Sequence, residues 1–538
     1  MKENGKPKVA YFCMEYGLKS DFKLYAGGLG ILAGDYLKAA KDNNLPVVGI
    51  GLLWKQDYTQ QYLDEKGFPY DTFPEFNYDF LEDTGVKIML TIGGRDVYCK
   101  IWKVDKFNNA PLYLLDTDIE ENKNWVVTDQ LYAGYSDRRI PQELVLGIGG
   151  IRAIRALGID IDIYHFNEGH AVFAGIELIR EKMHNENLSF EKAWEKVRNQ
   201  IVFTTHTPVE AGNELHNLDM LWEKGTYNEL SYTQLKEIGG DPFNMTIAGL
   251  KLSKKANAVS ELHCKTANRM WDFVNDRAPI IAVTNGVHRN TWLDYRLKKA
   301  YKNNENLWET HLELKKELID FIKARTGVKF NINNLLIGSA RRATEYKRTN
   351  LILEFEHKIN HLLKDGLLQL LFSGKAHPDD IHGKTIISHL IQMSKKYPKS
   401  IVFLENYDME IAKKMVTGCD VWLNTPRRPN EASGTSGMKA AMNGVLNLST
   451  LDGWWPEACI HGKNGWQFGD SFHSKNIWEQ DRHDTESLYA VLLKDVIPIY
   501  YNDKEKWAQM MRASIDSVYE KFSAQRMILD YYEKMYCI

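Results

Sequence analysis

Short apolar runs recur along the chain, and most of them lead into a polar or glycine-rich stretch that is followed by a helical pattern. Apolar runs of about four to eight residues bounded by turn signals are typical of buried strands. In the first half of the chain, this pattern predicts strands at 8–14, 46–53, 160–164, 201–205, 256–262 and 280–283. In the second half, it predicts strands at 335–339, 367–372, 401–404 and 419–423. Strands that alternate with helices favour parallel sheets.

Helical periodicity completes this picture. It predicts helices at 31–41, 139–157, 305–325 and 504–535, and the stretch rich in Tyr, Phe and Asp before residue 139 is expected to form surface excursions. Two successive series of strands and helices imply an α/β fold with two doubly wound, Rossmann-type domains that face a cleft. We expect domains at 1–300 and 301–500, followed by a C-terminal helix at 501–538 that packs back across their junction.

Composition and charge exclude several classes of protein. With 538 residues, 44% apolar and 26% charged, the chain is an ordinary globular protein of two or three domains. Its net charge of −3 favours neither a nucleic acid nor an anionic membrane as partner. The six cysteines lack CxxC spacing, which suits reduced thiols, and we find neither a signal peptide nor an apolar run that could span a bilayer. These features predict a cytoplasmic protein.

Aromatic residues are abundant, with 14 tryptophans and 27 tyrosines. Flat apolar faces edged with hydrogen-bonding groups suit sugar rings, whereas any single aromatic residue is more often part of the core or an interface. The composition therefore raises carbohydrate as a candidate ligand class.

The stretch EASGTSGMKAAMNG, residues 431–444, follows a predicted strand and opens a predicted helix. Its small residues leave backbone amides open at a helix N-terminus, where the macrodipole favours an anion such as phosphate. Lys439 lies four residues after Thr435, on the same helix face and about 6 Å along the axis. Its side chain leans back toward the N-terminus. Pyridoxal phosphate is one ligand that needs both a phosphate site and an amine, so it is a candidate for this segment. The alternative interpretation of the segment is a capped helix with a solvated lysine and no ligand.

Other polar segments follow the carboxyl ends of predicted strands, which is the ligand-binding edge of an open parallel sheet. They include YAGGLG at 25–30, HFNEGH at 165–170, HTPVEAG at 206–212 and TNGVH at 284–288. Taken alone, the glycine segment predicts a tight turn, because it lacks the full dinucleotide spacing. There is neither an HExxH motif nor a Cys/His pair at ligand spacing, so we expect no metal site.

Four cations occur within eight residues after the strand at 335–339, namely Arg341, Arg342, Lys347 and Arg348. Such a cluster is either a solvated helix face or a local anion site. Its position favours the anion site, because the cluster and the loop at 433–436 follow strands of the same predicted sheet. Two anions could then bind side by side.

Together these motifs resemble those of the α-glucan (glycogen, starch or maltodextrin) phosphorylases. The resemblance rests on EASGTSGMKAAMNG, RRATEYKR, FLENY, YAGGLG, the HTP-x-x-AG segment and TNGVH, which occur in consistent order, and DGWWPEA at 452–458 is similar to the compact prokaryotic branch. It implies the two-domain GT-B fold, an N-terminal glucan-binding domain and a C-terminal domain that binds pyridoxal 5'-phosphate. The partners would be an α-1,4-glucan and inorganic phosphate, and a homodimer would be the usual assembly, although the sequence leaves the oligomeric state open.

The resemblance also assigns roles to single residues. Lys439 would carry the cofactor as a Schiff base, with Gly434, Thr435, Ser436, Arg341 and Tyr407 around it. Arg342, Lys347 and Gly28 would hold the substrate phosphate. Glu431, Ser433, Gly434, Asn285, Tyr346, Leu29 and His206 would surround the substrate, and the catalytic group would comprise Lys439, Arg342, Lys347, His206 and Glu431. Departures from the family pattern occur at Thr344, Arg341, Asp408 and Ser436.

The implied reaction is reversible phosphorolysis of terminal α-1,4 bonds, which gives glucose 1-phosphate with retention. A phosphate dianion stabilises positive charge on the anomeric carbon, and the leaving oxygen receives its proton through the substrate phosphate. The first alternative is a nucleotide-sugar glucosyltransferase such as glycogen or starch synthase, which has no use for an amine at Lys439. The second is a non-catalytic glucan-binding protein, which would not need the basic residues at 341–348.

Overall fold

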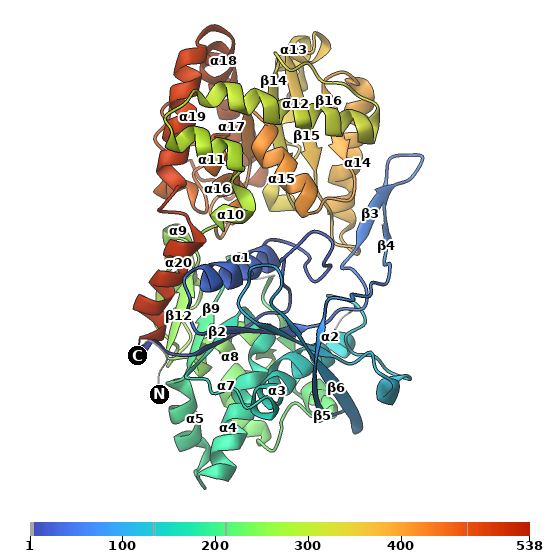
Figure 1. The fold of residues 1–538 in the computed structure, drawn as a ribbon, viewed down its shortest axis with the longest axis vertical. Coiled ribbons are helices and arrows are strands. Elements are labelled where there is room, and N and C mark those ends of the chain that lie inside the picture. Colours follow the sequence, from blue (N-terminus) through green and yellow to red (C-terminus); the bar gives the residue numbers. More distant parts are fainter. Residues whose placement is uncertain (1–4, 133, 135, 210–211, 471, 538) are drawn as a thin grey trace. The chain divides into compact units, whose positions relative to one another are not determined.

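The computed structural model describes residues 5–132, 134, 136–209, 212–470 and 472–537. The chain forms two compact units (Figure 1). The first unit comprises the residues up to Tyr58, Phe73–Thr284 and the residues from Ala524 onward, and the second comprises Thr59–Thr72 and Asn285–Ser523. Among the helices of the described residues, none combines the length and the apolar character that crossing a membrane requires. The domain limits expected from the sequence remain a proposal.

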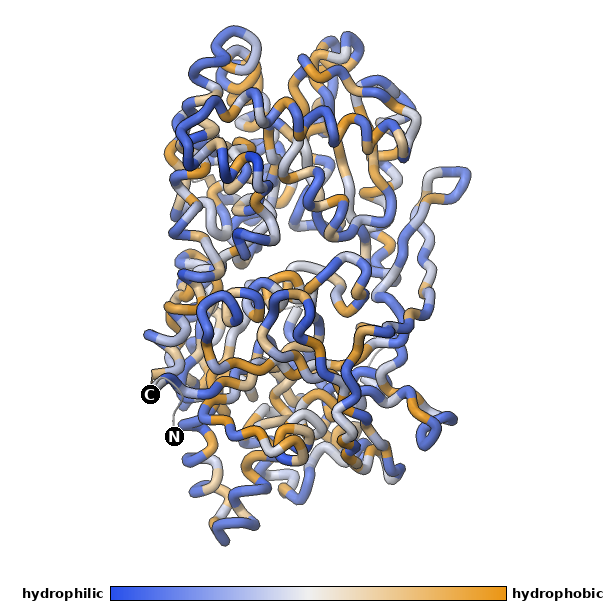
Figure 2. Tube along the Cα trace, in the orientation of Figure 1, coloured by the Kyte–Doolittle hydropathy of each residue, from blue (hydrophilic) through white to orange (hydrophobic). Residues whose placement is uncertain are grey.

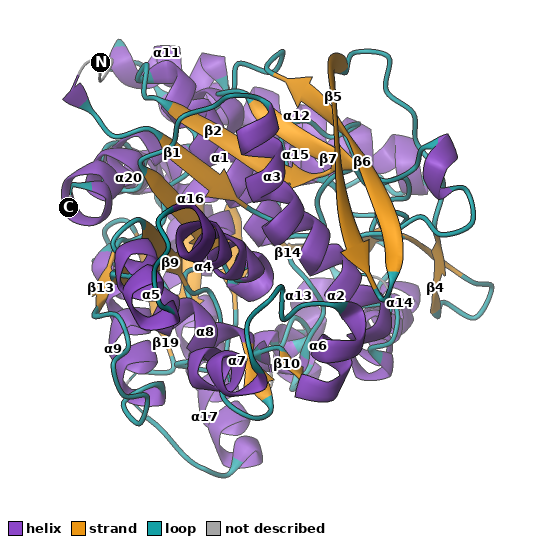
Figure 3. Ribbon diagram, turned by 90° about the horizontal axis from the view of Figure 1, so that it is seen from below, coloured by secondary structure: helices purple, strands orange, loops and turns teal. Residues whose placement is uncertain are grey.

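The first unit is built on a nine-stranded sheet with the order β13-β12-β9-β8-β1-β2-β7-β6-β5. Its strands are β1 (Val9–Phe12), β2 (Val47–Leu52), β5 (Glu82–Ile92), β6 (Arg95–Val104), β7 (Leu112–Asp116), β8 (Ile163–Asn167), β9 (Ile201–Thr204), β12 (Lys255–Ala258) and β13 (Ile280–Ala282). The strands from β13 to β7 are parallel, whereas β6 and β5 are antiparallel to their neighbours. Figure 3 shows β1 beside β2, and β5 beside β6.

The strands β5, β6 and β7 lie in the stretch that we expected to form surface excursions, so this expectation was wrong for them. In β5, the exposed positions alternate with more buried ones over Val86–Ile92. Such a strand covers the core with one face only, and its exposed residues, which include Lys87 and Thr91, interrupt the apolar run that marks a buried strand. The same stretch also holds the hairpin β3 (Gln60–Leu63) and β4 (Pro69–Thr72), which belongs to the second unit.

Helices of the first unit cover this sheet. They are α1 (Gly28–Asp42), α2 (Ser136–Leu144), α3 (Gly150–Ala156), α4 (Phe173–Asn185), α5 (Phe190–Arg198), α6 (Leu218–Lys224), α7 (Tyr232–Gly239), α8 (Met245–Leu252), α9 (Glu261–Met270) and α20 (Ala524–Tyr531). The helix predicted at 139–157 corresponds to α2 and α3, which are joined by the π-helical turn Val145–Gly149.

The C-terminal residues complete the first unit, where α20 lies alongside α1 (Figure 1). The Tyr536 hydroxyl lies 2.5 Å from that of Tyr36 and 2.7 Å from Nδ1 of His165, so the end of the chain is hydrogen-bonded to α1 and to β8. The single helix predicted at 504–535 is therefore interrupted. Its first part is α19 (Lys504–Val518) in the second unit, and its second part is α20 in the first.

The second unit has a six-stranded, fully parallel sheet with the order β16-β15-β14-β17-β18-β19. Its strands are β14 (Leu335–Ala340), β15 (Leu368–Ser373), β16 (Ile401–Leu404), β17 (Val421–Asn424), β18 (Leu446–Thr450) and β19 (Gly465–Phe468). The strand order reverses between β14 and β17, and such a switch point is where open α/β sheets bind ligands. In each unit the strand order runs outward in both directions, so the predicted α/β, doubly wound fold class is confirmed.

The helices of the second unit are α10 (Arg289–Trp292), α11 (Tyr295–Lys302), α12 (Leu307–Thr326), α13 (Asn360–Lys364), α14 (Ile381–Lys396), α15 (Met409–Gly418), α16 (Thr435–Met442), α17 (Ile477–Val491), α18 (Ile497–Asn502) and α19. Hydrophobic residues follow the inner strands of each unit in Figure 2, whereas the peripheral turns are hydrophilic.

A buried ion pair connects α12 to the start of β17. Nζ of Lys315 lies 2.6 Å from Oδ2 of Asp420, and the side chains of both residues are fully buried. Nζ also donates to the Asn334 carbonyl at 2.7 Å, and His311 lies 2.9 Å from the other oxygen of Asp420. A buried charge is tolerated only when it is paired and hydrogen-bonded, so these contacts must form together.

We therefore expect Asp420→Asn to destabilise the second unit, because the substitution leaves the buried Lys315 charge without its counter-charge. The expected loss of unfolding free energy is about 3–5 kcal/mol. Urea unfolding followed by tryptophan fluorescence measures it. Glu486→Gln, which removes a solvent-exposed charge paired with Arg482, is the matched control and should leave the transition midpoint unchanged. Equal midpoints for the two variants would contradict this account of the pair.

Candidate functional site

The loop before α16 joins β17 to the helix that carries Lys439. Gly434 caps the helix with φ +81° and ψ 59°, a left-handed conformation that favours glycine. The Ser433 carbonyl accepts a hydrogen bond from the Trp454 amide at 3.0 Å. A Cβ atom at Gly453 would lie 2.3 Å from that carbonyl oxygen, so glycine is required there. The loop is thus fixed against the segment that follows β18, and the amide end of α16 is held in place.

Lys439 lies in this helix with only 7% of its surface exposed. Its Nζ is 3.8 Å from the centroid of the Trp292 ring, within the range of a cation–π interaction. The Asn443 side chain donates to the carbonyls of Trp292 and Lys439, at 2.8 and 2.9 Å, and so holds the two backbones together. The solvated lysine considered from the sequence is therefore excluded. Trp292 was missed, although it follows the TNGVH segment closely.

Glu431 accepts hydrogen bonds from two cations of the basic cluster. Nη2 of Arg341 lies 2.7 Å from its carboxylate, and Nζ of Lys347 lies 2.7 and 3.1 Å from its two oxygens. Burial raises the pKa of Glu431, but the charges of Lys347 and Arg341 outweigh this effect and lower the pKa overall. The carboxylate is ionised at neutral pH and offsets much of the local positive charge.

Several buried polar atoms in the segments that follow β14 and β17 have no hydrogen-bond partner among the described residues. They are Nε and Nη1 of Arg341, Oγ of Ser433 and Oγ1 of Thr344. Buried polar groups are nearly always hydrogen-bonded, so the two Arg341 nitrogens, which can only donate, point to an anionic ligand. Arg341, which the sequence linked to a phosphate, thus retains free donors beyond its bond to Glu431.

The basic cluster is not a helix face. Its residues form a loop with the single 3₁₀ turn Glu345–Lys347, and Arg348 adopts a left-handed φ of +46°. Arg348 is 4% exposed and donates to the carbonyls of Thr425 and Pro426 at 2.8 and 3.0 Å. One of the four cations therefore has a structural role, whereas Arg342 is solvent-exposed.

The remaining predicted residues of the second unit differ in their surroundings. Tyr407 follows β16 and packs against the core, where burial raises the pKa of its hydroxyl. Asp408, a departure from the family pattern, caps α15 by accepting hydrogen bonds from the amides of Glu410 and Ile411 at 3.0 Å.

Ser436 in α16 is a second departure from the family pattern, and its Oγ lies 3.2 Å from Nε1 of Trp422. Thr435 is the first residue of α16. The Asn285 residue is buried, with 3% of its surface exposed. The Lys347 ammonium lies 4.9 Å from the centroid of the Tyr346 ring.

In the first unit, Glu15 holds the glycine segment. Its Oε2 accepts from the amides of Ala26 and Gly27 at 2.7 and 3.0 Å, and its Oε1 accepts from the Tyr132 hydroxyl at 2.9 Å. Gly28 and Leu29 follow directly as the first residues of α1, so the segment is a helix N-terminus rather than a plain turn. We did not predict Glu15, although its position after the first strand was an available signal.

His206 lies after β9 in the same unit. Its Nε2 is 2.6 Å from Oδ1 of Asn167, and its backbone amide donates to the Glu168 carboxylate. Burial lowers the pKa of His206 to about 3, so the imidazole is neutral. Glu168 has φ +73°, an unusual value for a residue other than glycine, and also accepts from the Thr207 hydroxyl at 3.2 Å. Residues 210 and 211 of the HTP-x-x-AG segment lie outside the described residues.

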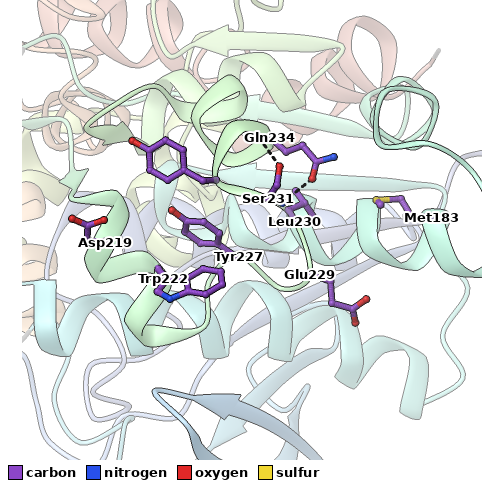
Figure 4. A pocket seen from close by; sticks show the side chains of 9 residues that line it. Met183, Asp219, Trp222, Tyr227, Glu229, Leu230, Ser231 and Gln234 are labelled. Carbon is purple, nitrogen blue, oxygen red and sulfur yellow. Dashed lines mark hydrogen bonds between the residues drawn. The ribbon is translucent and has the colours of Figure 1, made fainter.

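A cavity of about 650 Å³ opens elsewhere in the first unit, at α6 and α7. Figure 4 shows Trp222 beside Tyr227, with Asp219, Glu229 and Gln234 on the surrounding wall. None of the predicted site residues lines it.

Comparison with known proteins agrees with this geometry. Residues 294–490 match the family model for carbohydrate phosphorylases. The chain is 39% identical to the maltodextrin phosphorylase of Thermococcus litoralis, over 98% of this chain and 70% of that protein. It is 36% identical to the glycogen phosphorylase of Aquifex aeolicus, over 99% of this chain and 86% of that protein. The chain belongs to the carbohydrate phosphorylase family.

An uncharacterized protein of Methanocaldococcus jannaschii is 36% identical over 98% of this chain and 99% of its own length. The resemblance inferred from the motifs is thus confirmed, and the synthase alternative is not favoured. Family membership is consistent with the contact between Arg341, which follows β14, and Glu431, which follows β17.

Asp452 is the buried acid that supports the loop. Its oxygens accept from the amides of Glu431 and Gly453, at 2.9 and 2.8 Å. Burial, with a further contribution from the Glu431 charge, raises the pKa of Asp452 to about 7. The folded state therefore retains a proton that the unfolded chain loses near pH 4.

Because the pKa of Asp452 is higher in the folded than in the unfolded chain, the contribution of Asp452 to stability falls as pH rises from about 4 to about 7. We expect Asp452→Asn to gain stability relative to the unsubstituted chain over this interval, by up to about 4 kcal/mol. Urea midpoints measured at pH 4.5 and pH 8 test this, with the half-exposed Asp495→Asn as control. A stability difference that does not change with pH would contradict the raised pKa.

Proposed function

We propose that this chain is an α-1,4-glucan phosphorylase, which transfers the terminal glucosyl unit of a glucan to inorganic phosphate and releases glucose 1-phosphate with retention. The observation that carries the proposal is the buried Lys439 amine against the Trp292 ring, on a helix whose N-terminus follows the Glu431 to Gly434 loop. The relatives named maltodextrin phosphorylase and glycogen phosphorylase support an α-glucan as the substrate class.

We infer that pyridoxal 5'-phosphate binds covalently to Lys439. The residues fit this group, because they combine a buried primary amine, an aromatic face, the amides of Gly434, Thr435 and Ser436 at a helix N-terminus, and the orphaned nitrogens of Arg341. Tyr407 is the further aromatic residue proposed to contact it. When bound, the cofactor supplies a phosphate group that can hold the proton required by the departing sugar oxygen.

The chain's own residues would then bind and orient the substrates. Lys347 and the exposed Arg342 are proposed to hold the substrate phosphate, together with the Gly28 amide. In the absence of that phosphate, Glu431 balances Lys347 and Arg341. Substrate phosphate would compete for these cations and release the carboxylate of Glu431 to accept hydrogen bonds from sugar hydroxyls. Glu431 thus keeps the cations from being unpaired in a largely buried site.

The remaining residues are proposed to surround the glucosyl unit. His206 is neutral, and if its Nε2 proton is donated to Asn167, then Nδ1 can accept from a sugar hydroxyl. Ser433 and Asn285 would offer polar atoms from the second unit, with Tyr346 and Leu29 as further contacts. We propose 1–300 as the glucan-binding domain, 301–500 as the cofactor-binding domain and 501–538, which holds α19 and α20, as a C-terminal segment that packs back across their junction. A cytoplasmic location and a homodimer belong to the same proposal.

A nucleotide-sugar glucosyltransferase is the second candidate, and Lys439 separates it from the phosphorylase. A sugar-nucleotide donor has no need of a buried amine at this position, whereas covalent attachment of pyridoxal phosphate requires one.

Protein produced with pyridoxal phosphate should therefore show the near-ultraviolet absorbance of the lysine-bound cofactor and release glucose 1-phosphate from maltodextrin and phosphate. Lys439→Ala should lose the absorbance and at least a hundredfold of the activity. Lys414→Ala, a substitution of a partly exposed lysine that bonds to Glu317, is the control and should retain both. Unchanged absorbance in Lys439→Ala, or glucosyl transfer from a nucleotide sugar without the absorbance, would refute the assignment.

A further inference from the structure

A second cluster of ionisable side chains lies in the first unit, at a site that the proposed reaction does not use. Glu143 is on α2, His216 is in the short strand β10 (Leu215–His216), and Glu214 lies directly before that strand. One potential ligand atom from each of the three residues lies within 4.8 Å of the other two. Glu143 is 0% and His216 is 1% exposed.

We propose that Glu143, Glu214 and His216 bind a divalent transition-metal ion, with Zn²⁺ as the best match. Two carboxylates and one imidazole are a nitrogen–oxygen ligand set that suits zinc, and the imidazole disfavours Mg²⁺ and Ca²⁺, which prefer oxygen ligands alone. Three protein ligands leave one position of a tetrahedral ion for water or a further side chain. The sequence predicted no metal site, because Glu143 lies 71 and 73 positions before Glu214 and His216 and the three residues do not form a recognised ligand motif.

An unsatisfied buried oxygen is the independent observation that points to a ligand. Oε2 of Glu143 lies 2.9 Å from Nε2 of His216, but Oε1 is buried and meets no hydrogen-bond donor in the part of the chain that the structure describes. A carboxylate that is fully buried pays a large desolvation cost, and leaving one of its oxygens unpaired adds to that cost. A cation bound between Glu143 and Glu214 would remove both penalties.

Charge balance leads to the same conclusion. Arg139 is the nearest cation, with its Nε 3.5 Å from Oε1 of Glu214, and it can neutralise only one of the two carboxylates. A divalent ion would supply the positive charge that the second carboxylate lacks.

Two imidazoles lie at this site. Nδ1 of His216 lies 3.4 Å from Oγ of Ser136, a partner that could fix the tautomer with Nε2 directed at the ion. Nε2 of His170 lies 4.0 Å from Oε2 of Glu214, so this ring is the nearest candidate for the fourth position.

The ion would connect β10 to α2 within the first unit. Glu214 and His216 follow the segment that begins at His206, whereas Glu143 lies one turn after Arg139, which stacks on Tyr132 with its guanidinium carbon 4.7 Å from the ring centroid. The Tyr132 hydroxyl in turn donates to Glu15. The site would thus fix β10 relative to α2, which is a structural role.

Metal binding to the untagged, full-length protein tests the proposal. After treatment with a chelator, the protein is dialysed against Zn²⁺, and the bound metal is measured by mass spectrometry and titration calorimetry. We expect one Zn²⁺ per chain with a dissociation constant in the micromolar range or below, undisturbed by millimolar Mg²⁺, and a rise in the thermal midpoint upon binding. Failure of the unsubstituted chain to bind one equivalent in this range would overturn the proposal.

Two variants locate the ion. Glu143→Gln keeps the shape of the side chain but removes its charge, and His216→Gln removes the imidazole, so each should weaken Zn²⁺ binding at least tenfold. His184→Gln, which removes an exposed histidine paired with Glu229, should bind as the unsubstituted chain does. Unchanged affinity in Glu143→Gln and His216→Gln would overturn the assignment. Should either variant fail to fold, Co²⁺ bound to the unsubstituted chain must show the visible bands of a four-coordinate site, and their absence counts against it.

Discussion

The burial of one primary amine is the constraint on which the site of the second unit depends. Lys439 is held in α16 against the Trp292 ring, and this position requires the helix to begin at Thr435 after a left-handed Gly434. The loop before it can adopt this conformation only because Gly453 allows the Ser433 carbonyl to approach closely. Two glycines and the Asn443 side chain therefore determine where the amine lies.

In each unit, a carboxylate accepts hydrogen bonds from donors at or next to the proposed site residues. Glu431 bonds to Arg341 and Lys347 in the second unit, and Glu15 bonds to the amides of Ala26 and Gly27 in the first. Cations and amides arranged to bind anions would be costly if they were buried without a partner. Internal carboxylates make the unliganded protein stable, and an anionic substrate can compete with them because its charge is of the same sign.

The sequence predicted those parts of the fold that follow from local pattern. Continuous apolar runs located β1, β2 and β14, whereas β5 was missed because exposed residues such as Lys87 and Thr91 alternate with its buried ones. The helix expected at 504–535 is interrupted between α19 and α20, since its two parts pack in different units. Periodicity does not carry information on which core a helix joins.

The candidate site shows the same division. Lys439 and its loop could be predicted, because small residues before a helix and a lysine one turn later are local features. Trp292, Glu15 and Asp452 were not predicted, since the contact through which each contributes is not visible in the local pattern. The four cations at 341–348 are similar in sequence, yet Arg348 is structural and Arg341 has free donors, a difference that only tertiary contacts create.

Chemical trapping of the cofactor tests the central claim most directly. Protein purified with pyridoxal phosphate is reduced with borohydride, digested and analysed by peptide mass spectrometry. The account predicts one phosphopyridoxyl group per chain, attached to Lys439 in the peptide that contains residues 431–444. A label on another lysine, or no stoichiometric label at all, would contradict the account.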